Sequence, residues 1–237
     1  MWNKVNRIML GEDQVRPTQQ PRTPTAVTSG YRPLTTITTT SDQSGNNRDM
    51  TIYWYTSFWT YAGVDCANIT GDWKNNMYNT DASWWSITGT QAFTYSLRFN
   101  FTSHYDQGLA GLIWINNTQY VDDKYICTQA DGKIRGTVGS SSVYIPSFSL
   151  NTRYLFNLVY DGTTLKIYQN WTLIDSTACA GTTNTSTTLG LWWDDKYATY
   201  SYCCEGYLSS VIVETVAWTD DEVLRYYNDT KATYWIS

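Results

Sequence analysis

The segment that most constrains the fold is FTYSLRFNF, residues 93–101, in which apolar and polar side chains alternate without a break. In an extended chain one side would carry Phe93, Tyr95, Leu97, Phe99 and Phe101. The other side would carry Thr94, Ser96, Arg98 and Asn100. This period of two predicts a β-strand with one buried face and one solvent face. Because a single apolar face must be covered, the chain needs a second packed layer.

Further β-prone segments are separated by turn signals. We expect strands at residues 51–58, 111–115, 124–128, 133–138, 154–160, 164–169, 187–192 and 206–216. Asp131-Gly132 and Asp161-Gly162 lie between such segments and predict hairpin turns. Thr219 and Glu222 have the spacing of a capping box, which predicts a short helix. The predicted fold class is all-β, a two-sheet antiparallel jelly-roll sandwich with one short C-terminal helix.

The beginning of the chain has a different composition. Four of the five prolines fall in the first 33 residues, at Pro17, Pro21, Pro24 and Pro33. We therefore predict an extended Pro/Thr-rich arm at residues 1–49 and a sandwich at residues 50–237. The Thr-rich run at residues 34–40 suits addition to a sheet, either that of a neighbouring subunit, which we expect, or that of its own domain.

Charge and composition restrict the function. Charged residues make up 16% of the chain, against roughly 25% in an average domain, and the net charge is −5. We expect no nucleic-acid-binding surface on the sandwich, because such a surface needs clustered Lys and Arg. A surface built from Thr, Ser, Asn and Tyr favours an extracellular or virion-surface location.

No segment has the apolar length of a membrane span, and the N-terminus lacks the apolar run of a secretory signal. Three explanations stay open: a removed signal, an engineered start, or release inside an assembling particle. Met1 favours the last.

The five cysteines favour disulfides over metal ligands or free buried thiols, because no CxxC spacing occurs and His104 is the single histidine. The disulfide candidates are Cys66, Cys127, Cys179, Cys203 and Cys204. Their pairing stays open, and the odd number leaves one thiol over. Sequons mark candidate glycosylation sites at Asn68, Asn100, Asn116, Asn170, Asn184 and Asn228.

We expect no cofactor and no metal. Calcium would have to use the adjacent pairs Asp122 with Asp123 and Asp194 with Asp195. Adjacent aspartates on a strand point in opposite directions, so solvated turns are the simpler interpretation.

A resemblance to a known superfamily adds to this interpretation. Residues 153–176, RYLFNLVYDGTTLKIYQNWTLIDS, resemble the laminin-G-like hairpin in the concanavalin A-like lectin-glucanase superfamily. The similar positions are Tyr160, Asp161, Gly162, Leu165, Ile167, Tyr168 and Asn170; Trp171 departs, because the family has Gly there. The resemblance covers residues 50–229 and implies two antiparallel sheets with Greek-key connections.

The superfamily includes glycoside hydrolases, which use paired carboxylates. The chain has four glutamates, at Glu12, Glu205, Glu214 and Glu222, and none stands in an E-x-D-x-x-E pattern. We expect no enzyme activity, with a hydrolase using Glu214 as the weakest alternative.

Clustered aromatic residues are the remaining signal. Aromatic rings stack on sugar rings, and neighbouring polar groups bond the hydroxyls. The candidate glycan-binding residues are Trp192, Trp193, Asp194, Asp195, Tyr197, Trp84 and Trp85. Packing in the core or in protein interfaces is the alternative role for these indoles.

Together these features predict a non-enzymatic structural protein of an extracellular assembly, with a virion capsid or surface protein as the first choice. In this hypothesis residues 1–49 anchor the sandwich to neighbouring subunits. The alternative is a secreted or cell-surface carbohydrate-binding or adhesion module.

Overall fold

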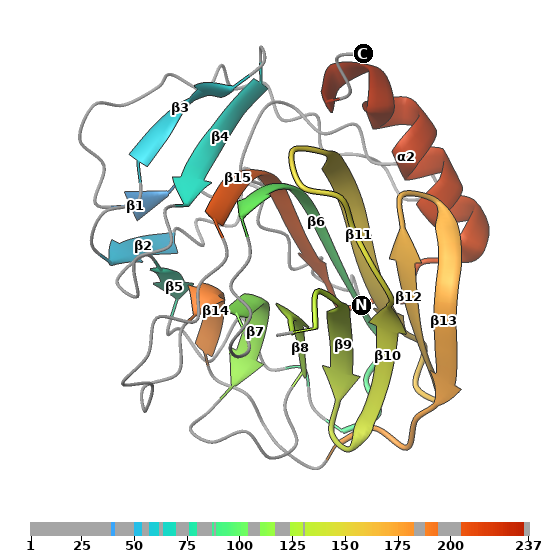
Figure 1. Ribbon diagram of the computed structural model, residues 1–237. Coiled ribbons are helices and arrows are strands. Elements are labelled where there is room, and N and C mark those ends of the chain that lie inside the picture. The colour runs from blue at the N-terminus through green and yellow to red at the C-terminus, as the bar shows by residue number, and fades with distance from the viewer. Residues whose placement is uncertain are drawn as a thin grey trace, which may run out of the picture.

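The computed structural model describes residues 39–40, 50–53, 57–61, 64–69, 76–79, 87, 89–103, 110–116, 124–129, 131–182, 188–193 and 205–234. In this part of the chain two antiparallel sheets pack face to face, and one C-terminal helix covers the outer side of one sheet (Figure 1). The predicted fold class is confirmed.

The first sheet has eight strands in the spatial order β1-β2-β5-β14-β7-β8-β9-β10. Their bounds are β1 Thr39–Thr40, β2 Met50–Tyr53, β5 Asn76–Asn79, β14 Thr188–Trp193, β7 Ala110–Asn116, β8 Lys124–Thr128, β9 Ile134–Val138 and β10 Ser141–Ile145. The second sheet has seven strands in the order β13-β12-β11-β6-β15-β4-β3. Their bounds are β13 Thr172–Ala178, β12 Thr164–Gln169, β11 Arg153–Tyr160, β6 Phe93–Ser103, β15 Glu205–Glu214, β4 Val64–Ile69 and β3 Ser57–Tyr61.

The core lies between the sheets, and the apolar side of β6 is its centre. Phe93, Tyr95, Leu97, Phe99 and Phe101 are each fully buried in it, as the alternation predicts. Across the core the first sheet contributes Ile126, Ile134, Val138, Val143 and Ile145. Gly136 of β9 leaves room for Leu158 of β11, since a Cβ there would overlap Leu158 Cδ1.

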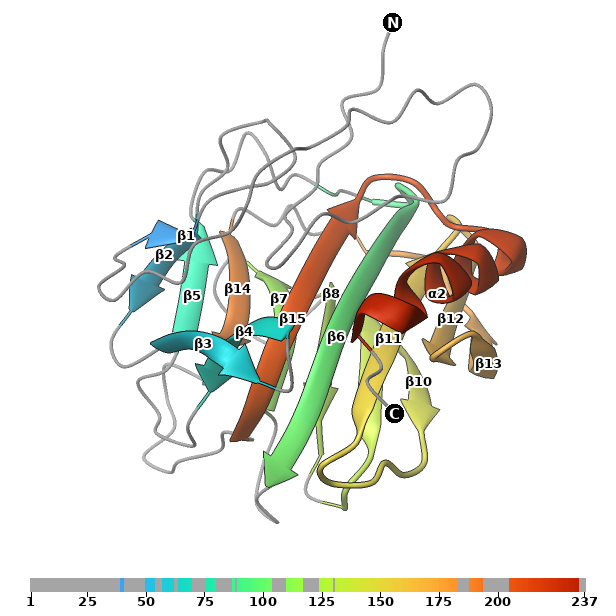
Figure 2. The same ribbon diagram turned by 90° about the horizontal axis from the view of Figure 1, so that it is seen from above.

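The other side of β6 corrects the prediction of a solvent face. Thr94, Ser96, Arg98 and Asn100 are at most 3% exposed. The helix α2, Asp220–Tyr234, lies over this side of the second sheet (Figure 2). An apolar cluster that includes Leu155, Ile212, Trp218, Val223 and Tyr226 fills the space between them. Arg98 Nη2 donates to Thr230 Oγ1, and the guanidinium lies 5.2 Å from the ring centre of Tyr226.

The capping box at the start of α2 is confirmed. Glu222 N donates to Thr219 Oγ1 at 3.2 Å, and Thr219 N donates to Glu222 Oε2 at 2.8 Å. Asp220 then accepts hydrogen bonds from Tyr168 Oη at 2.7 Å and Lys166 Nζ at 2.9 Å, which tie the helix start to β12.

Both predicted hairpin turns are also confirmed. Gly132 has a φ of 76° between β8 and β9, and Gly162 has a φ of 102° between β11 and β12. Asp161 Oδ1 accepts hydrogen bonds from Thr163 N and Thr164 N, so the side chain closes its turn. At the next hairpin the left-handed residue is Asn170, with a φ of 61°, and Trp171 follows it without a positive φ.

The predicted single strand at residues 51–58 is wrong. The segment contributes to two strands, β2 in the first sheet and β3 in the second, so the chain changes sheets between them. Thr39 and Thr40, which fall in the predicted arm, pair with Thr51 and Met50 of the same chain. The remainder of residues 1–49 lies outside the described residues, as do Trp84 and Trp85.

The disulfide prediction is wrong for Cys127 and Cys179, whose thiols are free and buried. Burial raises the pKa of Cys127 to about 12, although Arg135 opposes the shift, so the thiol stays protonated. Gly181 N donates to Cys179 Sγ at 3.4 Å. Cys66 is 4% exposed on β4, and Cys203 and Cys204 lie outside the described residues.

The sequons differ in accessibility. Asn100 is 3% exposed within β6, so a glycan there would disrupt the fold, and this candidate is wrong. Asn228 is exposed on α2, whereas Asn68 and Asn170 are partly buried. Asn116 ends β7, and Asn184 lies outside the described residues.

Candidate functional site

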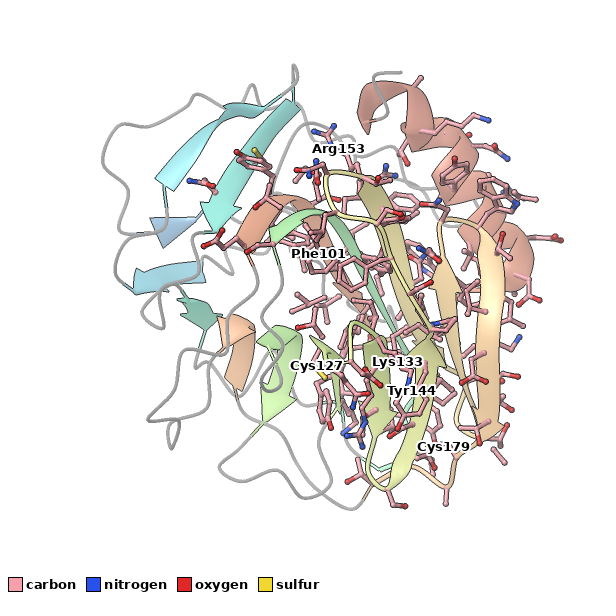
Figure 3. The ribbon with its side chains drawn as sticks, viewed as in Figure 1. Phe101, Cys127, Lys133, Tyr144, Arg153 and Cys179 are labelled. Atoms are coloured by element: carbon pink, nitrogen blue, oxygen red, sulfur yellow. The ribbon has the colours of Figure 1, made fainter. Side chains whose placement is uncertain are left out.

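The candidate site is the outer side of the first sheet at β8, β9 and β10. Because inward residues of these strands belong to the core, the residues that alternate with them face away from it. We call this surface the Arg135 face; it consists of Tyr125, Cys127, Arg135, Thr137, Ser142 and Tyr144. Figure 3 labels Cys127 of β8 and Tyr144 of β10, the strands on either side of β9, together with Lys133, which directly precedes β9.

The strand register arranges these six residues in two rows. One row joins Tyr125, Thr137 and Ser142, and the other joins Cys127, Arg135 and Tyr144. Directly opposed residues on one face have Cβ atoms about 5 Å apart. Arg135 is therefore central, with a neighbour on each adjoining strand.

Arg135 is held by contacts that cross between the rows. Its Nε and Nη2 donate to Ser142 Oγ at 3.1 and 2.9 Å. Its guanidinium carbon lies 5.8 Å from the ring centre of Tyr125, within the range of a cation–π contact. Thr137 Oγ1 lies 3.1 Å from the same Ser142 hydroxyl, which fixes that hydroxyl in turn. The guanidinium is thus oriented before any ligand arrives.

Tyr144 is the accessible aromatic residue of the face, with 37% of its surface exposed. Its backbone N–H donates to Asp175 Oδ2 of β13 at 2.9 Å. This hydrogen bond joins β10, the edge strand of the first sheet, to β13, the edge strand of the second. Tyr125, Cys127 and Thr137 are at most 5% exposed, and Arg135 and Ser142 are partly exposed. The part of the face that a ligand can reach is therefore the β9–β10 side.

Lys133, two positions before Arg135 and directly before β9, is a second cation. Its Nζ forms an ion pair with Asp131 Oδ2, and the hydrogen bond from Lys133 lowers the pKa of Asp131. Within the described residues, Arg135 has no such carboxylate partner. The two cations are therefore different: Lys133 is neutralised and Arg135 is not.

The predicted glycan-binding residues fall partly on this sheet. Trp192 and Trp193 end β14, and Trp193 pairs with Gly111, which pairs with Cys127. Trp193 thus occupies the register row of Arg135, about 14 Å away if strands are roughly 4.8 Å apart. Asp194, Asp195 and Tyr197 lie outside the described residues, as do His104, Asp122 and Asp123.

Sequence reasoning missed Arg135, Ser142 and Tyr144. The run at residues 133–138 alternates Lys133, Arg135 and Thr137 with apolar or small residues, which was a signal for an outward polar row. The partner strand β10 was not predicted, so the sequence did not indicate that Ser142 and Tyr144 lie beside this row.

The acidic residues fit structural roles. Glu214, the residue of the hydrolase alternative, is fully buried, and its Oε2 accepts from Trp218 Nε1 at 2.7 Å. Glu222 belongs to the capping box. Among the residues that the structure describes, no group of three His, Cys, Asp or Glu side chains could hold a metal. In the same residues no helix has the length and apolar character to cross a bilayer.

A second aromatic group lies on the other sheet. Trp171, at the turn between β12 and β13, is 47% exposed and packs against Tyr227 of α2, with ring centres 4.5 Å apart and ring planes inclined by 43°. Lys231 Nζ lies 5.7 Å from the Tyr227 ring centre. Close by in sequence, Leu173, Ile174 and Leu224 are 36 to 41% exposed.

No family model and no curated protein matches the chain. Solved structures do. The binding domain of botulinum neurotoxin serotype G has a TM-score of 0.67 at 13% identity, over 83% of this chain and 50% of that one. The binding domain of Paraclostridial Mosquitocidal Protein 1 has a TM-score of 0.65 at 14% identity, over 80% and 49%. The chain therefore spans about half the length of these toxin domains.

A third structure is matched over nearly its whole length. Domain 4 of AbnA, a GH43 extracellular arabinanase from Geobacillus stearothermophilus, was solved in complex with arabinotriose. It has a TM-score of 0.59 at 14% identity, over 79% of this chain and 92% of that one. These likenesses show the fold: the chain is a two-sheet β-sandwich of the architecture found in these domains.

Proposed function

We propose that the chain is a non-enzymatic carbohydrate-binding module and that the Arg135 face is its binding surface. The observation that carries the proposal is the arrangement of Arg135, Ser142 and Tyr144, a fixed donor group beside an exposed ring. Sugars are bound by this combination, because C–H faces stack on aromatic rings while hydroxyls need oriented polar partners. The remaining residues of the face hold these groups in position.

The similar structures support the proposal. Domain 4 of AbnA holds arabinotriose, and the chain matches 92% of that domain. The toxin domains are binding domains by description. The structural role of Glu214 argues against the hydrolase alternative, since a fully buried carboxylate does not reach a substrate. An extracellular location fits such a module, and laminin-G-like membership stays a prediction.

The test is a glycan array probed with the full chain, with Tyr144→Ala and with Trp171→Ala. We expect the wild type to bind a defined subset of glycans and Tyr144→Ala to lose at least about fivefold in affinity, since a stacked aromatic ring contributes roughly 1 kcal/mol or more. Trp171→Ala removes an exposed ring from the other sheet and should bind as the wild type. Absence of glycan binding by the wild type would contradict the proposal, and loss in Trp171→Ala alone would move the site to α2.

One observation favours the second candidate, a subunit of an extracellular assembly. The edge strand β13 exposes Leu173 at 41% and Ile174 at 36%, next to Trp171. An open edge with exposed apolar side chains is a template for pairing with another chain. The virion and the anchoring arm remain a hypothesis, because they depend on residues 1–49.

This candidate is tested by the mass of the full chain in solution, measured by light scattering. One chain has a mass of 27.2 kDa. An assembly subunit would give a multiple of that mass, and Leu173→Glu at the edge would reduce it to a single chain. A monomeric wild type at high concentration would argue against self-assembly through β13.

A further inference from the structure

We infer that the ligand of the Arg135 face is acidic, and that Arg135 reads a carboxylate on the sugar. This inference rests on the proposed function and names the ligand class for the same face. It comes from the donors of Arg135 that no hydrogen bond within the described part of the chain occupies.

The guanidinium has five N–H donors, and two of them point at Ser142 Oγ, one from Nε and one from Nη2. Five less two leaves three, the second hydrogen of Nη2 and both hydrogens of Nη1. Ser142 therefore occupies the Nε–Nη2 edge, and the Nη1–Nη2 edge is left for a ligand. Two parallel N–H donors at one edge match the two oxygens of a carboxylate.

Charge argues in the same direction. In the described part of the chain the two ion pairs are Lys133 with Asp131 and Lys166 with Asp220, and neither involves Arg135. The carboxylate of Asp175 is engaged by backbone groups: its Oδ2 accepts a hydrogen bond from Tyr144 N, and its Oδ1 accepts one from Ser176 N. Arg135 is therefore a partly exposed cation with no carboxylate partner among the described residues, and a carboxylate on the ligand would supply that partner.

Orientation strengthens the interaction. Tyr125 supports one side of the guanidinium and Ser142 fixes its edge, so little side-chain entropy remains to be lost when a ligand binds. A lysine at this position would supply a positive charge without the two parallel N–H donors of the guanidinium. Tyr144, opposite Arg135 on β10, is placed to stack on the same sugar residue.

The experiment is calorimetric titration of the full chain with matched pairs of oligosaccharides. One pair is a trigalacturonide and its methyl ester, and another is sialyllactose and lactose. The acidic member of at least one pair should bind about ten- to hundredfold more tightly, as a charged bidentate hydrogen bond is roughly twice as strong as a neutral one. Arg135→Gln should abolish the difference, and Arg135→Lys should retain part of it.

The control is Lys133→Gln, which removes the neutralised cation two positions before Arg135 and should keep the preference. Circular dichroism and thermal melting check that each variant is folded, and the comparison within the wild type needs no variant. Equal affinity for acidic and neutral members would overturn the inference while leaving the proposed function standing. Absence of binding to both members of every pair, together with an empty array, would overturn both.

Discussion

Arg135 and Ser142 are joined across neighbouring strands by two hydrogen bonds, from Nε at 3.1 Å and from Nη2 at 2.9 Å to a single hydroxyl oxygen. This relationship turns a long, flexible side chain into a fixed group.

Removal of the Ser142 hydroxyl should weaken ligand binding while leaving the fold intact. In Ser142→Ala the guanidinium loses its fixed edge, and we expect about a three- to tenfold loss of affinity, as one hydrogen bond contributes roughly 1 kcal/mol. Ser140→Ala changes an exposed residue two positions away in the β9–β10 turn and should bind as the wild type. Equal affinity of the two variants would show that Ser142 does not position Arg135.

The contact between α2 and β12 should give the fold an acid-sensitive component. Hydrogen bonds from Tyr168 and Lys166 lower the pKa of Asp220 from its ordinary 3.8. A carboxyl group with a lowered pKa in the folded state stabilises the fold above its unfolded pKa, and this contribution is lost as the pH falls through the folded value. We expect the free energy of unfolding to decrease below about pH 4.

Urea unfolding between pH 5 and pH 2 measures this decrease. Asp220→Asn should be less stable than the wild type at pH 5 and should show a shallower decrease. Asp221→Asn, in the same helical turn, should keep the slope of the wild type. If the free energy of unfolding of Asp220→Asn fell with pH as steeply as that of the wild type, groups other than Asp220 would cause the acid sensitivity.

The capping box should contribute measurably to stability. Thr219→Ala removes the oxygen that accepts from Glu222 N and should lower the free energy of unfolding by about 1 kcal/mol. Thr219→Ser retains that oxygen and should be close to the wild type. Chemical denaturation of the two variants distinguishes them, and equal values would mean that the box is dispensable.

Cys127 and Cys179 should be unreactive in the folded protein. Both thiols are buried, and the pKa of Cys127 is raised to about 12, so Cys127 forms little thiolate at neutral pH. A thiol reagent should label both only after unfolding, and non-reducing peptide mapping should show both as free cysteines. A mapped peptide joining Cys127 to Cys179 would be incompatible with the structure.

The fold was predictable where local pattern determines structure. The alternation at residues 93–101 identified the inward side of β6, since each of its apolar residues is buried. Asp131-Gly132 and Asp161-Gly162 identified turns because a positive φ favours glycine. Thr219 and Glu222 identified the start of α2 for an equally local reason.

The rest depended on contacts between distant segments. Arg98 and Thr230 are 132 positions apart, and nothing in the sequence near Arg98 indicates that a helix covers it. The site was missed for the same reason: Arg135, Ser142 and Tyr144 become neighbours through the register of β9 and β10. SSVYI begins with two serines and lacked a strand signal, so the pairing was not foreseen.

A nuclear magnetic resonance titration of the full chain with the tightest acidic glycan found would locate the binding surface. We expect the amide shifts on binding to concentrate at Arg135, Ser142 and Tyr144 and the Arg135 side-chain N–H signals to move with them. Shifts concentrated at Trp171, Tyr227 and Lys231, with the Arg135 face unchanged, would show that the glycan binds elsewhere.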